Sequence, residues 1–127
     1  METRTPAGVT LRFDEAGEGD PAIVFVHGWC CSRDNWRHQV AHFSRSHHVI
    51  ALDQRGHGES DKPDQDYTIA GFVDDLAWFI GDGGLDRPVI VAYLIIIIVL
   101  VFVIINMIVD ILCSILDPRV RLQDHET

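Results

Sequence analysis

Residues 22–32 read AIVFVHGWCCS and residues 49–60 read VIALDQRGHGES, and these two stretches decide the fold. Each stretch begins with a short apolar run and then changes to glycine and polar residues. An uninterrupted apolar run of this length is typical of a strand buried on both faces of a parallel sheet. The sequence therefore predicts buried strands over residues 22–26 and 48–52, each followed by a glycine-containing loop.

Helical patterns follow both predicted strands. Ser32 can cap a helix in which Trp36, Val40 and Phe43 recur at helical spacing and which ends near Ser44. A second helix is predicted from Thr68 to the glycines at 81–84, with one apolar face made of Ile69, Phe72, Val73, Leu76, Phe79 and Ile80.

The alternating residues Val9 to Phe13 predict an edge strand ahead of the first buried strand. A third apolar run opens at Pro88 and supplies a further strand. Strands that alternate with helices indicate the α/β class, with a mostly parallel sheet and flanking helices.

The segments FVHGWCCSRDNW and VIALDQRGHGESDKP, about 26 residues apart at the ends of predicted strands, resemble the α/β-hydrolase superfamily. The nearest branches are the esterases, carbon–carbon hydrolases, haloalkane dehalogenases and epoxide hydrolases. The resemblance covers residues 8–91 and implies a partial α/β-hydrolase fold. It also implies that intact relatives hydrolyse ester, carbon–halogen, epoxide or carbon–carbon bonds of small molecules, with no cofactor and no metal.

The HGW segment is the candidate oxyanion loop. A glycine at position 28, just past a buried strand, lets the backbone turn sharply and present its next N–H groups to an oxyanion. The resemblance assigns the backbone N–H of Trp29 as the oxyanion-hole donor, with His27 and Gly28 in the same loop. Cys30 and Cys31 could be reactive thiols or a metal pair with His27, but adjacent cysteines are awkward metal ligands, so small hydrophobic residues are the favoured interpretation.

The DQRGHGES segment is interpreted as structural. Its two glycines predict a tight bend, and Asp53 and Arg55 can satisfy loop backbone groups and each other. His57 and Ser60 are less suited to catalysis than to packing and hydrogen bonding in this loop.

The nucleophile elbow of such a hydrolase, usually G-x-S-x-G or a variant with aspartate, should follow Val89–Val91. The chain instead reads AYLIII over residues 92–97, which puts Leu94 at the nucleophile position. Leucine can neither attack nor ionise, and the β-branched isoleucines resist the strained backbone of an elbow. No nucleophile, catalytic acid or catalytic histidine is identified, and His125 lies in a polar tail. We therefore expect a truncated and inactive member of the family.

Residues 88–109 carry no charge and would span roughly 33 Å as a helix, which is the thickness of a bilayer. The predicted organisation is an N-terminal hydrolase part over residues 1–91, an apolar segment over 92–116, as a core helix or a transmembrane-like helix, and a polar tail over 117–127. Two alternatives stay open: a single-span membrane-anchored protein, and a noncatalytic interaction module that self-associates through an exposed sheet edge.

The composition narrows the partners and the compartment. A net charge of −9 argues against nucleic acid as a partner. Three cysteines without framework spacing favour a reducing compartment, and the polar start METRTPAGVT does not resemble a signal peptide. The expected location is cytoplasmic, with membrane association as the alternative.

Overall fold

The computed structural model describes residues 1–92 and 95–116. Residues 1–93 form a compact unit built on a five-stranded sheet with the order β1-β2-β4-β3-β5, and α3 belongs to a second unit. The elements are β1 (Glu2–Arg4), β2 (Thr10–Ala16), β3 (Ile23–Val26), the 3-10 helix η1 (Arg33–Trp36), α1 (Arg37–Phe43), β4 (Val49–Asp53), α2 (Ile69–Asp82), β5 (Val89–Ala92) and α3 (Ile95–Leu116).

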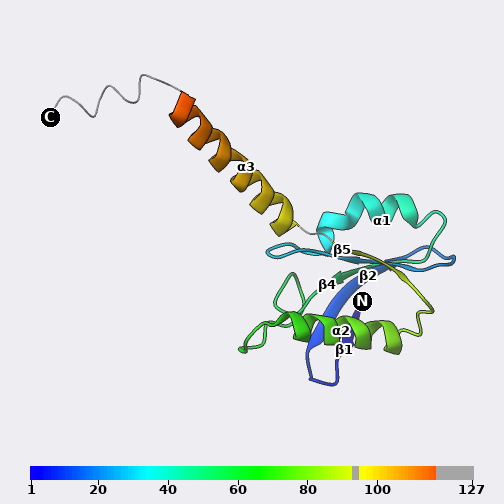
Figure 1. Cartoon of the computed structure of the whole chain (residues 1–127). Coiled ribbons are helices and arrows are strands. Elements are labelled where there is room, and N and C mark those ends of the chain that lie inside the picture. The colour runs from blue at the N-terminus through cyan, green and yellow to red at the C-terminus, as the bar shows by residue number, and fades with distance from the viewer. Residues whose placement is uncertain (93–94, 117–127) are drawn as a thin grey trace. The chain divides into compact units, whose positions relative to one another are not determined.

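The two strands predicted from apolar runs, β3 and β4, form the centre of the sheet, and every residue of both is buried. Successive side chains alternate between the faces of a strand. Val24 and Val26 therefore pack with Phe79 of α2, whereas Ile23 and Phe25 pack with Trp36 of η1. Figure 1 shows α1 and α2 on opposite faces of the sheet. This three-layer arrangement confirms the predicted α/β class.

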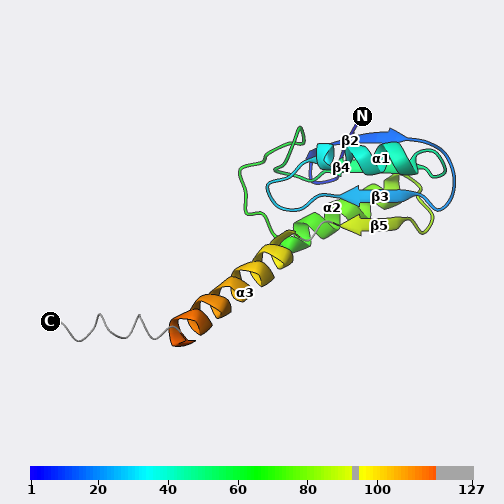
Figure 2. The same cartoon turned by 90° about the horizontal axis from the view of Figure 1, so that it is seen from above.

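The sheet is mixed, so the expectation of a mostly parallel sheet is corrected. β3 is parallel to both β4 and β5, but β2 runs antiparallel to β4 and β1 antiparallel to β2. Figure 2, seen from above α1, shows β2, β4, β3 and β5 side by side. The prediction of β2 as an edge strand was also wrong, because β1 pairs with its outer side through a register that joins Thr3 to Leu11.

The two predicted helices are present with small corrections. Ser32 is the N-cap of η1, which continues into α1, and α1 ends at the C-cap Ser44. Thr68 caps α2 by accepting a hydrogen bond from the Gly71 N–H. The predicted face of α2 is only partly correct, because Ile69 and Val73 are exposed.

The uncharged range 88–109 is not the one continuous helix that the single-span alternative expected. Its first part forms strand β5, which pairs in parallel with β3 because Val89–Ala92 can extend the ladder beside Ile23–Val26. The side chains of α3 are described over residues 99–113 and at Ile115. Within the described residues, no helix has both the length and the apolar character needed to cross a membrane.

Candidate functional site

The candidate oxyanion loop lies at the carboxyl end of β3. His27 follows the last residue of the strand, and the chain then turns through Gly28 to Cys31, whose N–H donates to the Gly28 carbonyl oxygen at 3.3 Å. Cys30, the third residue of this turn, has a φ of 60°, a left-handed conformation that non-glycine residues adopt rarely. The glycine at position 28 and the turn after it were both expected from the sequence.

His27 is buried and uses both ring nitrogens. Its Nε2 accepts a hydrogen bond from the Gln54 backbone N–H at 3.0 Å, so the ring proton lies on Nδ1, which donates to the Gly28 carbonyl oxygen at 2.8 Å. Burial lowers the pKa of His27 below its usual range, and the nearby His57 adds to this, while the Gly28 bond and Asp53 oppose it. The ring is therefore a neutral structural group that joins two loops.

Trp29 combines an exposed ring with an available backbone donor. The residue is 55% exposed, and its ring meets the ring of His57 edge to face at a centroid distance of 5.2 Å. Across the described residues, no hydrogen-bond acceptor is found for the Trp29 N–H. A backbone N–H in a turn with no partner is the kind of donor that stabilises negative charge on a substrate oxygen.

Asp53 is fully buried at the end of β4, and its partner is Arg33. The carboxylate accepts hydrogen bonds from the backbone N–H of Arg33 at 2.6 Å, from the Arg33 guanidinium and from the Glu59 N–H at 3.0 Å. Burial opposes the charge of Arg33, but Glu59, Asp14 and Asp53 outweigh it and raise the pKa of the guanidinium. The prediction that Asp53 pairs with Arg55 was wrong.

Arg55 instead forms a two-pronged ion pair with Asp75 of α2. Its Nε and one terminal nitrogen each lie 2.5 Å from a carboxylate oxygen, and both side chains are at least nine-tenths buried. The hydrogen bonds to Asp75 raise the pKa of Arg55. This pair joins the DQRGHGES loop to the helix that covers one face of the sheet.

Both glycines of this loop have positive φ and are required by the close approach of a neighbouring side chain. Gly58 has a φ of +53°, and a Cβ there would lie 2.3 Å from the Asp53 carboxylate. Gly56 has a φ of +78°, and its Cβ would lie 2.5 Å from the Tyr67 ring. Ser60 is buried and donates from its hydroxyl to the Asp53 carbonyl oxygen at 2.6 Å, which gives it a structural place in the loop.

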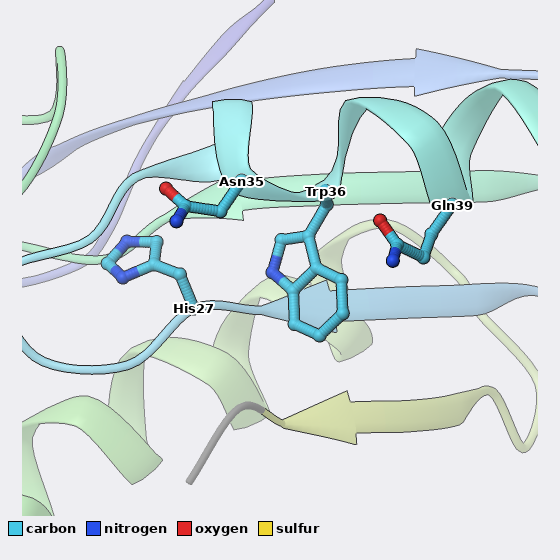
Figure 3. A pocket seen from close by; sticks show the side chains of 4 residues that line it. All are labelled: His27, Asn35, Trp36 and Gln39. Carbon is cyan, nitrogen blue, oxygen red and sulfur yellow. The ribbon is translucent and has the colours of Figure 1, made fainter. Parts of the chain in front are cut away.

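A small pocket of about 120 Å³ opens beside the buried His27 ring. Figure 3 shows the Trp36 indole between His27 and Gln39, with the Asn35 side chain turned toward His27. The pocket has the volume of a few water molecules. Asn35 Oδ1 accepts from the Ser32 N–H at 3.3 Å, so one of these amides also supports the start of η1.

The cysteines of the loop show no sign of a metal site. Cys30 is exposed, Cys31 is partly buried, and both are free thiols. Among residues 1–92 and 95–116, no three histidine, cysteine or acidic side chains gather in a way that could hold a metal ion. The exposure of Cys30 also departs from the interpretation of both cysteines as packed hydrophobic residues.

The end of β5 lies beside the oxyanion loop. β5 pairs with β3 in a register that places Ala92 opposite Val26, the residue before His27. Leu94, the residue at the predicted nucleophile position, lies outside the described residues, as does His125.

The match to known proteins falls within the compact unit formed by residues 1–93. Residues 21–93 match a family model described as the alpha/beta hydrolase fold. The chain belongs to the α/β-hydrolase fold family.

Relatives within the family include several epoxide hydrolases. Epoxide hydrolase A of Mycobacterium tuberculosis is 40% identical over 90 residues, which are 68% of this chain and 28% of that protein. The (E)-2-((N-methylformamido)methylene)succinate hydrolase of Acinetobacter baylyi is 40% identical over 65 residues, or 51% and 24% of the two chains. The crystal structure of an epoxide hydrolase from Vigna radiata aligns with a TM-score of 0.68 at 31% identity. The alignment covers 73% of this chain and 30% of the Vigna radiata chain. The chain thus spans about a quarter to a third of the length of these α/β-hydrolases.

Sequence reasoning missed three residues that hold the site: Gln54, Arg33 and Asp75. Gln54 and Arg33 bond across 27 and 20 positions, and a sequence pattern does not reveal such pairs. Asp75 did carry a signal, because a carboxylate that falls between Phe72 and Phe79 on the apolar stripe of a helix needs a buried partner.

Proposed function

We propose that residues 1–93 supply the oxyanion-loop part of a hydrolase site for small neutral electrophiles, with the Trp29 N–H as one oxyanion donor. The observation that carries this proposal is the Trp29 N–H, which has no acceptor among the described residues and sits in the turn that follows β3, the strand paired with β5. His27 and Gly28 hold the turn and take no part in bond breaking.

The substrate class follows from what an N–H donor can stabilise. Hydrolysis of an ester or of an epoxide places negative charge on an oxygen, and a preorganised backbone N–H lowers the energy of that charge. The likeness to epoxide hydrolases supports an epoxide as the substrate. The hydrolase of Acinetobacter baylyi shows that relatives of this stretch also act on other compounds.

The 127-residue chain by itself is proposed not to turn over substrate. Leucine occupies the position of the nucleophile, and the sequence contains no G-x-S-x-G segment. A donor for the oxyanion without an attacking group gives no covalent step. Purified protein should hydrolyse p-nitrophenyl acetate and styrene oxide at the rate of the blank. Hydrolysis above the blank that is lost in Trp29→Pro and kept in Trp29→Ala would contradict the inactivity and would support the donor.

The donor role is tested by supplying the other half of the site. In a chimera, residues 1–92 are followed by the part of Mycobacterium tuberculosis epoxide hydrolase A that comes after its matching stretch. The proposal predicts a folded chimera that hydrolyses an epoxide. A folded chimera with no activity would contradict it.

A further inference from the structure

Gln54 holds His27 from two sides. Its backbone N–H donates to His27 Nε2 at 3.0 Å, and its side-chain amide donates to the His27 carbonyl oxygen at 2.6 Å. Gln54 directly follows β4 and His27 directly follows β3, and the two strands are paired in register up to Val26 and Leu52. The clamp therefore joins the ends of the two buried central strands.

The clamp selects one tautomer of His27. Because Nε2 accepts a hydrogen bond, the proton of the neutral ring lies on Nδ1. Nδ1 then donates to the Gly28 carbonyl oxygen at 2.8 Å. With the opposite tautomer, two donors would face each other at Nε2 and two acceptors would face each other at the Gly28 oxygen.

The Gly28 carbonyl and the Trp29 N–H belong to the same peptide group. A peptide group is planar and trans, so its C=O and N–H point in opposite directions. The bond from His27 Nδ1 to the Gly28 oxygen thereby sets the direction of the Trp29 N–H. A second bond to the same oxygen, from the Cys31 N–H at 3.3 Å, closes the turn around it.

We propose that Gln54 is a positioning residue of the oxyanion loop: its backbone N–H keeps His27 in the Nδ1–H tautomer, its side-chain amide holds the His27 carbonyl group, and the two bonds together fix the Gly28–Trp29 peptide group. The use of the Trp29 N–H as an oxyanion donor rests on the proposed function, but the positioning itself does not. Two other titratable groups face the ring: Asp53, with an oxygen 4.0 Å from Nε2, and His57, with a ring centroid distance of 5.1 Å.

Nuclear magnetic resonance of the unmutated, ¹⁵N-labelled 127-residue protein gives the first test. The ring nitrogen shifts of His27 should show a protonated Nδ1 and an unprotonated Nε2 at pH 7.5. On acidification, protonation of Nε2 removes the acceptor for the Gln54 N–H, so the amide shifts of Gln54 and Trp29 should change together with the His27 ring signals. A proton on Nε2 at pH 7.5, or a Trp29 amide that does not follow His27, would overturn the proposal.

The variant Gln54→Met gives the second test, with Gln65→Met as its control. Methionine is similar in size to glutamine but cannot donate to the His27 carbonyl oxygen, and Gln65 is an exposed glutamine outside the clamp. The order parameter of the Trp29 N–H should fall from about 0.85, the value of rigid backbone, toward about 0.6 in Gln54→Met only. An unchanged order parameter in Gln54→Met would count against the clamp. Neither test involves a substrate, so an inactive chimera would contradict the proposed function and leave this inference standing.

Discussion

The carboxyl ends of β3 and β5 are neighbours in the sheet but differ in almost every other respect. Both strands consist of four apolar residues, and they are paired in register. β3 is buried throughout and runs into a loop whose carbonyl, ring and amide groups are joined by hydrogen bonds, whereas β5 is largely exposed and leads to Leu94. An apolar sequence alone therefore does not determine burial, which depends on what covers each strand. The HGW motif follows β3, whereas the sequence after β5 contains no G-x-S-x-G motif.

The largest expected effect on stability comes from breaking the buried ion pair between Arg55 and Asp75. Arg55→Met leaves the Asp75 carboxylate buried without a partner, which should lower the free energy of unfolding by about 3–5 kcal/mol. The double variant Arg55→Met with Asp75→Leu should recover much of this loss. Arg87→Met is the matched control, because the Arg87 and Asp86 side chains are almost fully exposed, and it should leave the urea midpoint unchanged. Equal losses of unfolding free energy in Arg55→Met and Arg87→Met would show that the buried ion pair after β4 stabilises the protein no more than the exposed pair before β5.

A matched pair of truncations compares the strands themselves. Val24 of β3 is fully buried, and its register partner Ile90 of β5 is 48% exposed. Val24→Ala should cost about 2 kcal/mol of unfolding free energy, and Ile90→Ala less than about 1 kcal/mol although it removes more atoms. Urea denaturation followed by tryptophan fluorescence measures both. A larger loss in Ile90→Ala would mean that β5 is covered in solution.

The strands and the ion-pair partners behind these effects could be predicted only in part from the sequence. The runs AIVFV and VIAL specified β3 and β4 because burial on both faces leaves a local signature. The short strand β1 and the antiparallel direction of β2 left no such signature. The partners of Asp53 and Arg55 lie 20 positions away, at Arg33 and Asp75, so the two residues were wrongly paired with each other on the basis of their proximity in sequence.

The candidate site, too, could be predicted only in part from the sequence. The motif placed His27, Gly28 and Trp29 at the end of a strand, where the structure has them. It could not reveal the Gln54 clamp, because the bonds form only after β3 and β4 have paired. Leu94 lies outside the described residues, so its role stays a prediction, as do self-association and the cytoplasmic location.

Titration of the buried His27 ring should make the stability of the protein depend on pH. Its pKa is lowered in the folded protein, mainly by burial, so below the usual histidine value of about 6.5 the unfolded chain binds a proton that the folded chain does not. The free energy of unfolding should therefore fall as the pH is lowered from about 6.5 toward the folded-state pKa, by at most about 1.4 kcal/mol per pH unit. Urea titrations between pH 7.5 and 5.5 measure this slope. His27→Asn should flatten the slope, and an equally steep slope in that variant would assign it to other groups.

The smallest effect is expected at Cys30. Its left-handed backbone is strained for a side chain with a Cβ, whereas glycine adopts it freely. Cys30→Gly should raise the free energy of unfolding by about 0.5 kcal/mol, since the relief of strain is partly offset by the greater freedom of glycine in the unfolded chain. Cys31→Gly, at a residue without positive φ, should lower it. Thermal denaturation of the two variants gives the comparison, and a loss of stability in both would indicate that the turn is not strained.

The most direct test of the proposed oxyanion donor is the kcat for epoxide hydrolysis of the chimera that supplies the second half of the hydrolase. Trp29→Pro removes the N–H at a turn position where proline is common, and Trp29→Ala removes the ring but keeps the N–H. We predict a kcat about 10²–10³ lower in Trp29→Pro than in Trp29→Ala, the usual cost of one oxyanion donor. Equal kcat values in the two folded variants would contradict the assignment of the Trp29 N–H to the oxyanion site.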